Sequence, residues 1–175
     1  MDIFDVAEKR YSHKGMFLPD PVPLEDLERI AKVGIAAPSG GNTQCVKLVI
    51  LPNRAAIQPL HDISPANGLL TAPAAIVLLT EKQTGELNFE IEDYAAATAN
   101  MLLAAVQLGY VSLWLDSPFY GEAEQKQALE VLGATQDYHV YVVLPIGLPD
   151  GPGSRRKKLP FSERVFYGRL GQEKP

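Results

Sequence analysis

Hydrophobic residues recur at helical spacing in some segments and form continuous runs in others. These two patterns predict helices and strands that alternate along the chain. The pattern favours helices at residues 3–9, from 24 to a stop before Pro38, and at 54–60, 89–108 and 122–132. Continuous or β-branched apolar runs favour strands at residues 46–51, 74–80, 111–115 and 138–146. Such interleaving is typical of an α+β or an α/β domain, and the alternation alone leaves both open.

The longest uncharged stretch, residues 94–115, has a length that could span a bilayer. It carries the polar residues Thr98, Asn100 and Gln107, and Gly109 divides it in two. Its flanks are acidic and lack the lysine or arginine anchors of a membrane span. We therefore interpret this stretch as a buried helix followed by a buried strand.

Composition narrows the classes of function. With 175 residues, 46% of them hydrophobic, the chain is expected to form a single domain over residues 1–175. A net charge of -5 disfavours general binding to nucleic acid or to an anionic membrane. A lone Cys45 excludes a disulfide framework, and His13, His61 and His139 lack metal-ligand spacing. The N-terminus has no apolar signal-peptide region, so we expect a cytoplasmic enzyme or binding protein.

Two basic clusters could hold a phosphate group. Residues 10–14 combine Arg10 and Lys14 with the hydroxyl of Ser12, and arginine and lysine bind phosphate as a fork and as a point charge. Residues 154–158 contain four consecutive cations, whose mutual repulsion a bound anion would offset. Each cluster alone is also explained as a solvated surface, and the second also as a localisation signal or a nucleic-acid patch.

Two further segments carry polar groups where ligands commonly bind. Residues 38–44 contain Ser39, Asn42 and Gln44, which can pair with a polar heterocycle, and two glycines that allow close backbone approach. Residues 114–117 follow a predicted strand, and ligands often bind at strand ends. The alternatives are an ordinary loop and a core tryptophan followed by a turn.

Taken in order, these segments resemble the FMN-dependent nitroreductase family. The R-x-S-x-R/K element of that family matches residues 10–14, and its A-P-S-x-x-N-x-Q-P-W element matches residues 37–46. Its L-L-A-A-x-x-L-G helix matches residues 102–109, and its K/R-x-K/R-L-P element matches residues 156–160. Each motif is weak alone, but their joint order covers nearly the whole chain.

Two features depart from the family pattern. Cys45-Val46 stands where the family has Pro-Trp, which changes the packing after the polar loop. Residues 81–88 form too short a segment for the large helical lid of the family, which predicts an open flavin face.

The resemblance implies an α+β, nitroreductase-like fold, with a central, mostly antiparallel sheet wrapped by helices, in an intertwined homodimer. It implies FMN as cofactor, NAD(P)H as reductant, and a nitroaromatic, quinone or related acceptor reduced in a ping-pong cycle. A specialised flavin dehydrogenase or dehalogenase, or a flavin-binding module without turnover, are the alternatives. No catalytic side chain and no metal are expected.

The resemblance also implies the residues of an FMN site at the dimer interface. Arg10, Ser12 and Lys14 of one subunit would bind the phosphate, the polar chain and the ring edge, and Arg156 and Lys158 would complete the phosphate site. Further residues expected at the flavin are Tyr11, Trp114, Leu115, Asp116 and Ser117. The second subunit would supply Ser39, Gly40, Asn42 and Gln44. Asp116 is expected near N5 of the flavin ring.

Overall fold

The computed structural model describes residues 1–84, 88–116 and 118–174. Within them, five strands form one sheet: β1 (Val46–Leu51), β2 (Ala74–Glu81), β3 (Val111–Ser112), β4 (Leu115–Asp116) and β5 (Tyr138–Gly147). The strand order is β1-β2-β5-β3, with β4 also paired to β5, and every named pair is antiparallel. The predicted α+β class and antiparallel sheet are therefore confirmed.

Strand β2 lies at the centre of the sheet because both of its faces are apolar. Ile76 and Leu78 face one layer of helices, while Val77 and Leu79 face the other, as the two-residue period of a strand requires. Each of these side chains is at most 2% exposed. Full burial of one such side chain contributes about 1.5–3 kcal/mol, so β2 anchors both halves of the core.

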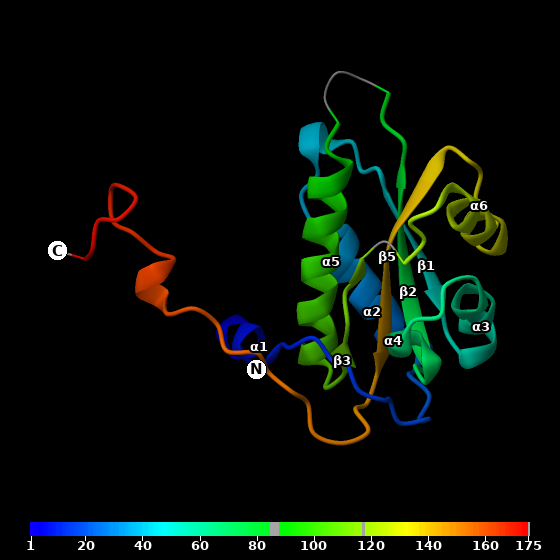
Figure 1. Ribbon diagram of the computed structural model, residues 1–175, viewed down its shortest axis with the longest axis horizontal. Coiled ribbons are helices and arrows are strands. Elements are labelled where there is room, and N and C mark those ends of the chain that lie inside the picture. Colours follow the sequence, from blue (N-terminus) through cyan, green and yellow to red (C-terminus); the bar gives the residue numbers. More distant parts are fainter. Residues whose placement is uncertain (85–87, 117, 175) are drawn as a thin grey trace.

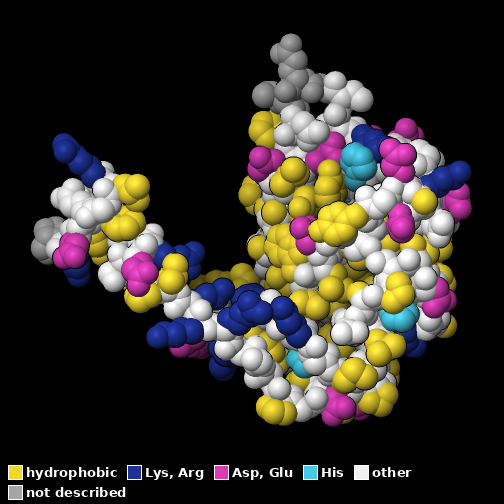
Figure 2. Space-filling model, in the orientation of Figure 1, with side chains coloured by type: hydrophobic (Ala, Val, Ile, Leu, Met, Phe, Trp, Pro, Cys, Tyr) yellow, Lys and Arg dark blue, Asp and Glu magenta, His cyan; other side chains and the backbone are white. Residues whose placement is uncertain are grey.

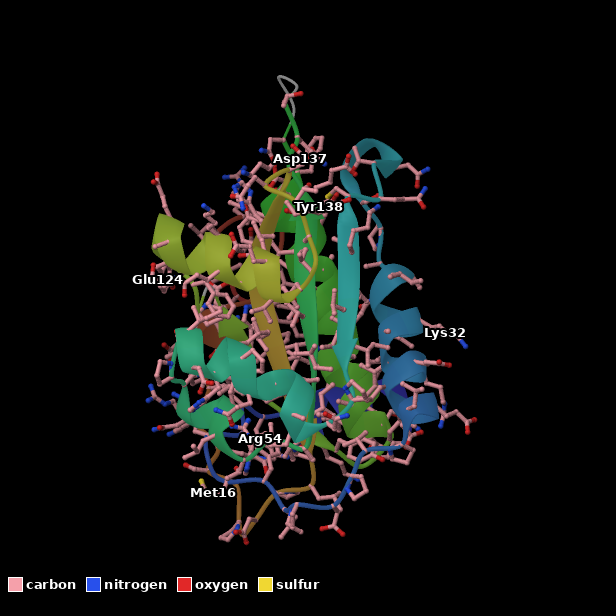
Figure 3. All side chains as sticks on the ribbon, turned by 90° about the vertical axis from the view of Figure 1, so that its right-hand side faces the viewer. Met16, Lys32, Arg54, Glu124, Asp137 and Tyr138 are labelled. Atoms are coloured by element: carbon pink, nitrogen blue, oxygen red, sulfur yellow. The ribbon has the colours of Figure 1, made fainter. Side chains whose placement is uncertain are left out.

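Helices cover both faces of the sheet (Figure 1). On one face lie α2 (Leu24–Ile35) and α5 (Glu90–Gln107), with α1 (Ile3–Lys9) packed against α5, and on the other face lie α3 (Arg54–Ile63), α4 (Asn67–Leu70) and α6 (Glu122–Val131). Figure 3 shows the second layer from outside, with Arg54 on α3 and Glu124 on α6. Helix α2 packs closely on α5 because Gly34 leaves room for Met101, whose Cγ would lie 2.6 Å from an added Cβ.

The C-terminal tail, residues 151–174, runs away from the body of the domain (Figure 1). It contains a short 3₁₀ turn, η2 (Phe161–Glu163), and exposes Phe161, Val165, Tyr167 and Leu170. A second 3₁₀ turn, η1 (Gly40–Asn42), precedes β1. In the part of the chain that the structure describes, no helix has the length and apolar character needed to cross a membrane.

Some predicted boundaries were wrong. The single strand expected at residues 111–115 is split into β3 and β4, and the register places Pro145 of β5 opposite the gap, where proline has no N–H to donate. Helix α3 runs on to Ile63 with Pro59 inside it, and the short α4 was not predicted. Residues 85–87 of the short segment before α5 lie outside the described residues.

Candidate functional site

The first basic cluster lies along the edge of the sheet. After α1 ends, Ser12 forms a parallel bridge with Ser112 of β3, and the His13 N–H donates to the Ser112 carbonyl at 3.0 Å. Arg10 and Tyr11 are half-buried here, whereas Ser12 and Lys14 are exposed. The backbone pairing thus holds a charged segment in extended form beside β3.

One residue of the second basic cluster, Arg155, contacts Tyr11 of the first and the end of α1 just before it, although 146 and 147 residues separate Arg155 from the two carbonyls that it bonds. The Arg155 guanidinium donates to the Glu8 carbonyl at 2.6 Å and to the Lys9 carbonyl, and lies 5.5 Å from the ring centroid of Tyr11. Figure 2 shows Lys and Arg side chains gathered where the tail leaves the body. We call Arg10, Ser12, Lys14, Arg155, Arg156 and Lys158 together the basic end.

The basic end fits a phosphate dianion. Among the described residues, none of the ion pairs involves Arg10, Lys14, Arg156 or Lys158. Of the lysines and arginines in the part of the chain that the structure describes, Arg29 alone forms an ion pair, so the basic end is distinguished by the concentration of its cations in two short segments. An anionic group with several acceptor oxygens would offset this charge, and both arginine and lysine bind such groups.

His13 was predicted to lie on the surface or in a strand, but the structure buries it outside the named strands. It is only 2% exposed, and its Nε2 lies 2.9 Å from the Met16 carbonyl. Since a carbonyl oxygen can only accept, Nε2 is the donor in that contact. Within the described residues, His13 Nδ1 and Ser112 Oγ are both buried without a hydrogen-bond partner. Buried polar atoms of this kind often mark a place that a ligand or water completes.

The polar loop is built around Asp93, a carboxylate only 3% exposed. Asp93 accepts from the Gly40 N–H at 2.7 Å, from the Thr43 hydroxyl at 3.1 Å and from the Cys45 thiol at 3.3 Å. Within the loop, the Ser39 hydroxyl accepts from the Gln44 N–H at 3.1 Å. We call Ser39, Gly40, Asn42 and Gln44, with their anchor Asp93, the loop end.

The glycine at position 40 is required by packing inside the chain. A Cβ added there would lie 2.1 Å from Cγ of Phe89. The close backbone approach that the sequence predicted is therefore an approach to Phe89. Asn42 and Gln44 have φ angles of 58° and 52°, in the left-handed region, so the loop has a defined and strained shape. Beside it is a hollow of about 280 Å³ lined in part by Ser39, Gln44 and Lys47.

The loop end and the basic end lie at opposite ends of α5 (Figure 1). Asp93 is in the first turn of α5, whereas α1 packs near its last turns. Since a helix rises about 1.5 Å per residue, an 18-residue helix separates its ends by roughly 27 Å. One copy of the chain therefore does not bring the loop end and the basic end together.

The strand-end segment lies beside α5, in contact with an aromatic cluster. The Tyr94 hydroxyl donates to Oδ1 of the exposed Asp116 at 3.4 Å. Tyr94 stacks on Tyr141 with centroids 4.5 Å apart and meets Trp114 edge-on at 6.3 Å. Burial, and then the Asp116 charge, raise the pKa of Tyr94, so it stays a donor. Leu115 is half-buried, and Ser117 lies outside the described residues.

Comparison with known proteins identifies the family. The model of the nitroreductase family matches residues 7–68. An Archaeoglobus fulgidus protein, provisionally named as an NADH dehydrogenase/NAD(P)H nitroreductase, is 33% identical over 129 residues, 71% of this chain and 73% of its own. The chain belongs to the nitroreductase family.

Solved structures share the fold of this nitroreductase-family chain. A Clostridium acetobutylicum protein, provisionally named as an NADH oxidase, is 28% identical with a TM-score of 0.78, covering 96% of this chain and 99% of its own. A provisional nitroreductase from Desulfovibrio desulfuricans, solved in complex with FMN, is 23% identical with a TM-score of 0.80, covering 100% of this chain and 99% of its own. The nitroreductase-like fold is therefore confirmed.

A second buried carboxylate, Glu90, which the sequence placed at a polar helix start, lies beside the loop end in the first turn of α5 and binds donors from β2, β5 and the segment before α5. Glu90 is 2% exposed and accepts from Thr80 Oγ1 at 2.9 Å, the Gln83 N–H at 2.8 Å and His139 Nδ1 at 3.0 Å. Burial alone would raise the pKa of Glu90, but these hydrogen bonds outweigh it and lower the pKa to about 2. The signal was helical spacing, since Glu90, Asp93 and Tyr94 share one buried face of α5.

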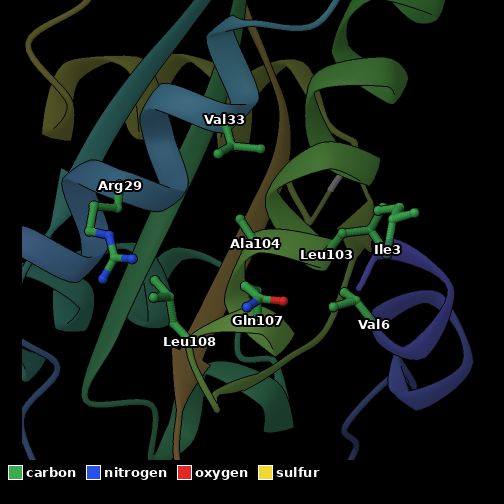
Figure 4. Close-up of a pocket in the computed structure, with 8 residues that line it drawn as sticks. All are labelled: Ile3, Val6, Arg29, Val33, Leu103, Ala104, Gln107 and Leu108. Carbon is green, nitrogen blue, oxygen red and sulfur yellow. The ribbon is translucent and has the colours of Figure 1, made fainter. Parts of the chain in front are cut away.

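An apolar groove of about 290 Å³ opens between α1, α2 and α5 (Figure 4). Its lining is mostly aliphatic and comes from Ile3, Val6, Arg29, Val33, Leu103, Ala104, Gln107 and Leu108. It lies at the same end of α5 as the basic end. A groove of this character is suited to apolar side chains from another segment.

Proposed function

We propose that this member of the nitroreductase family is an FMN-dependent oxidoreductase. It would take hydride from NAD(P)H and reduce a nitroaromatic, quinone or related acceptor in a ping-pong cycle. The observation that carries the proposal is the contact of Arg155 with Tyr11 and the end of α1, which brings two cation-rich segments distant in sequence to one end of the domain. The names of the curated relatives and the FMN held by the Desulfovibrio structure support it.

The basic end would hold the FMN phosphate. Arg10 and Arg156 offer guanidinium forks, and Lys14 and Lys158 add point charges. Ser12 would donate its hydroxyl to the phosphate or the ribityl chain. FMN, when bound, supplies the redox chemistry, while the chain binds it, orients it and tunes its charge.

The end of β4 would orient the flavin ring. Trp114, Leu115 and Asp116 would line the ring, with Asp116 near N5, because this segment runs from β3, whose Ser112 pairs with Ser12, to the Tyr94 contact near the start of α5. Backbone amides near Asp116 would stabilise negative charge on the reduced ring. We expect no side chain to act as an essential acid or base. Burial, and then Asp93, raise the pKa of Cys45, so this thiol is a poor nucleophile at neutral pH.

The proposed enzyme is a homodimer. Because the loop end and the basic end lie at opposite ends of α5, the loop end of a second copy would complete each FMN site. The tail exposes Phe161, Val165 and Leu170, and the apolar groove beside α5 offers such side chains a place on a second copy. We expect an interface of order 2,000 Å² or more.

Colour and bleaching of the purified protein test this function. FMN-loaded protein should be yellow and should bleach under anaerobic conditions with NADH or NADPH. Addition of a quinone or nitroaromatic should then restore the colour. Colour without bleaching by either nucleotide would favour the flavin-binding module, and failure to bind FMN would contradict the proposal altogether.

A further inference from the structure

Arg155 differs from the other cations of the basic end because its guanidinium N–H groups are already hydrogen-bonded within the protein. Its guanidinium donates to the carbonyls of Glu8 and Lys9, the last residues of α1, where carbonyl groups lack partners within the helix. The same guanidinium lies over the ring of Tyr11 at 5.5 Å. A cation near the C-terminus of a helix and over an aromatic ring is favourable in both respects.

The backbone before Arg155 is shaped to the same contact. A Cβ added at Gly153 would lie 2.2 Å from Cζ of Tyr11, so only glycine lets residues 151–155 pass this ring. In the described part of the chain, the two Arg155 bonds are the only hydrogen bonds between residues 151–174 and the rest of the protein. The path of the basic loop therefore depends on this one side chain.

The positions of these contacts link them to the phosphate ligands. Arg155 immediately precedes Arg156, while Lys9 and Tyr11 flank Arg10. The contact thus fixes the backbone within one residue of a proposed phosphate-binding arginine on each side. Without it, the basic loop would have to be ordered by the ligand, and binding would be weakened by the cost of that ordering.

We propose that Arg155 is a positioning residue that fastens the basic loop to the end of α1 and so pre-assembles the phosphate subsite. This inference rests on the proposed FMN function. Arg155 acts through its planar fork and its stacking on Tyr11, so its positive charge alone does not suffice. Lysine keeps the charge but loses both the fork and the stacking, so Arg155→Lys should behave like Arg155→Gln.

Paired titrations with FMN and riboflavin test this role, because riboflavin lacks the phosphate. Arg155→Gln and Arg155→Lys should each weaken FMN binding about ten-fold or more, since they remove hydrogen bonds from a charged donor. Riboflavin binding should change less than about two-fold. The matched control is Lys157→Gln, which removes one charge from the same exposed loop and should weaken FMN binding less than about three-fold.

Amide hydrogen exchange on flavin-free protein gives a readout independent of FMN. Residues 8–13 should exchange faster in Arg155→Gln than in the wild type or in Lys157→Gln. Wild-type FMN affinity in Arg155→Lys, an equal loss of riboflavin and FMN binding, or unchanged exchange in residues 8–13 would each overturn the inference. A wild-type protein that binds neither flavin would instead contradict the proposed function, and the exchange experiment would still decide whether Arg155 holds the loop.

Discussion

The loop end and the basic end of this molecule use charge in opposite ways. At the loop end, buried carboxylates have internal partners: Asp93 accepts from Gly40, Thr43 and Cys45, and Glu90 accepts from strand and loop donors. At the basic end, the cations have no carboxylate partner among the described residues, and the loop is held by Arg155.

This difference means that the loop end contributes to the stability of the fold, whereas the basic end contributes to ligand binding. Hydrogen bonds to a buried carboxylate stabilise the chain itself, so the loop end is a rigid part of the fold. Unpaired cations contribute little to the fold and repel one another, so the basic end keeps its charge for a ligand. Substitutions at the loop end should therefore lower stability first, and substitutions at the basic end should lower affinity first.

The largest effect is expected from Arg10→Ala, which should weaken FMN binding while the protein stays folded. Loss of one member of a close charge pair costs about 2–5 kcal/mol. Fluorescence titration with FMN measures the affinity, and urea unfolding should show a stability close to that of the wild type. Wild-type affinity in this variant would remove Arg10 from the site.

At the loop end, Asp93→Ala should act on the fold. It leaves the Gly40, Thr43 and Cys45 donors without their acceptor, and we expect a loss of about 3–4 kcal/mol in the free energy of unfolding. The neighbouring Glu92→Ala, on the exposed side of the same turn, is the control and should change stability by less than about 0.5 kcal/mol. Equal urea midpoints for the two variants would show that the loop is not anchored as described.

The contribution of Glu90 to the free energy of unfolding depends on pH. Its pKa falls from 4.5 to about 2 on folding, so its contribution is present above pH 4.5 and is lost as pH falls towards 2. The shift corresponds to about 3 kcal/mol. Urea unfolding at several pH values should show the wild type losing more stability than Glu90→Gln over this range. Parallel profiles would contradict the role of the Glu90 carboxylate.

The sequence predicted the central elements well because their patterns are local. The residues of β1 were predicted without error, and the apolar run at 74–80 became β2 with one more residue. The role of Asp93 as the anchor of the loop was not predicted. Its hydrogen-bond donors come from residues more than 45 positions away in the sequence. Nothing in the sequence distinguished Arg155 from the three cations that follow it, because its contact with the end of α1 exists only in the folded chain.

The smallest effects are expected from the histidines and the cysteine. The proposed mechanism needs no acid or base from His13, His61, His139 or Cys45. Each single substitution should leave the rate constant of flavin reduction within about ten-fold of the wild type, measured by stopped flow under anaerobic conditions. A loss of about 10²–10⁴-fold with FMN still bound would reveal a catalytic side chain.

The central claim is that each FMN site combines the basic end of one copy with the loop end of another, and mixed dimers test it most directly. Arg10→Ala and a loop variant carrying Asn42→Ala and Gln44→Ala should each bind FMN poorly as pure proteins. If the two are unfolded, mixed equally and refolded, random pairing leaves one intact site in each mixed dimer, or about one site in four overall. Recovery of about a quarter of the wild-type FMN capacity is the predicted result, and a mixture that binds no more FMN than its separate components would contradict the shared site.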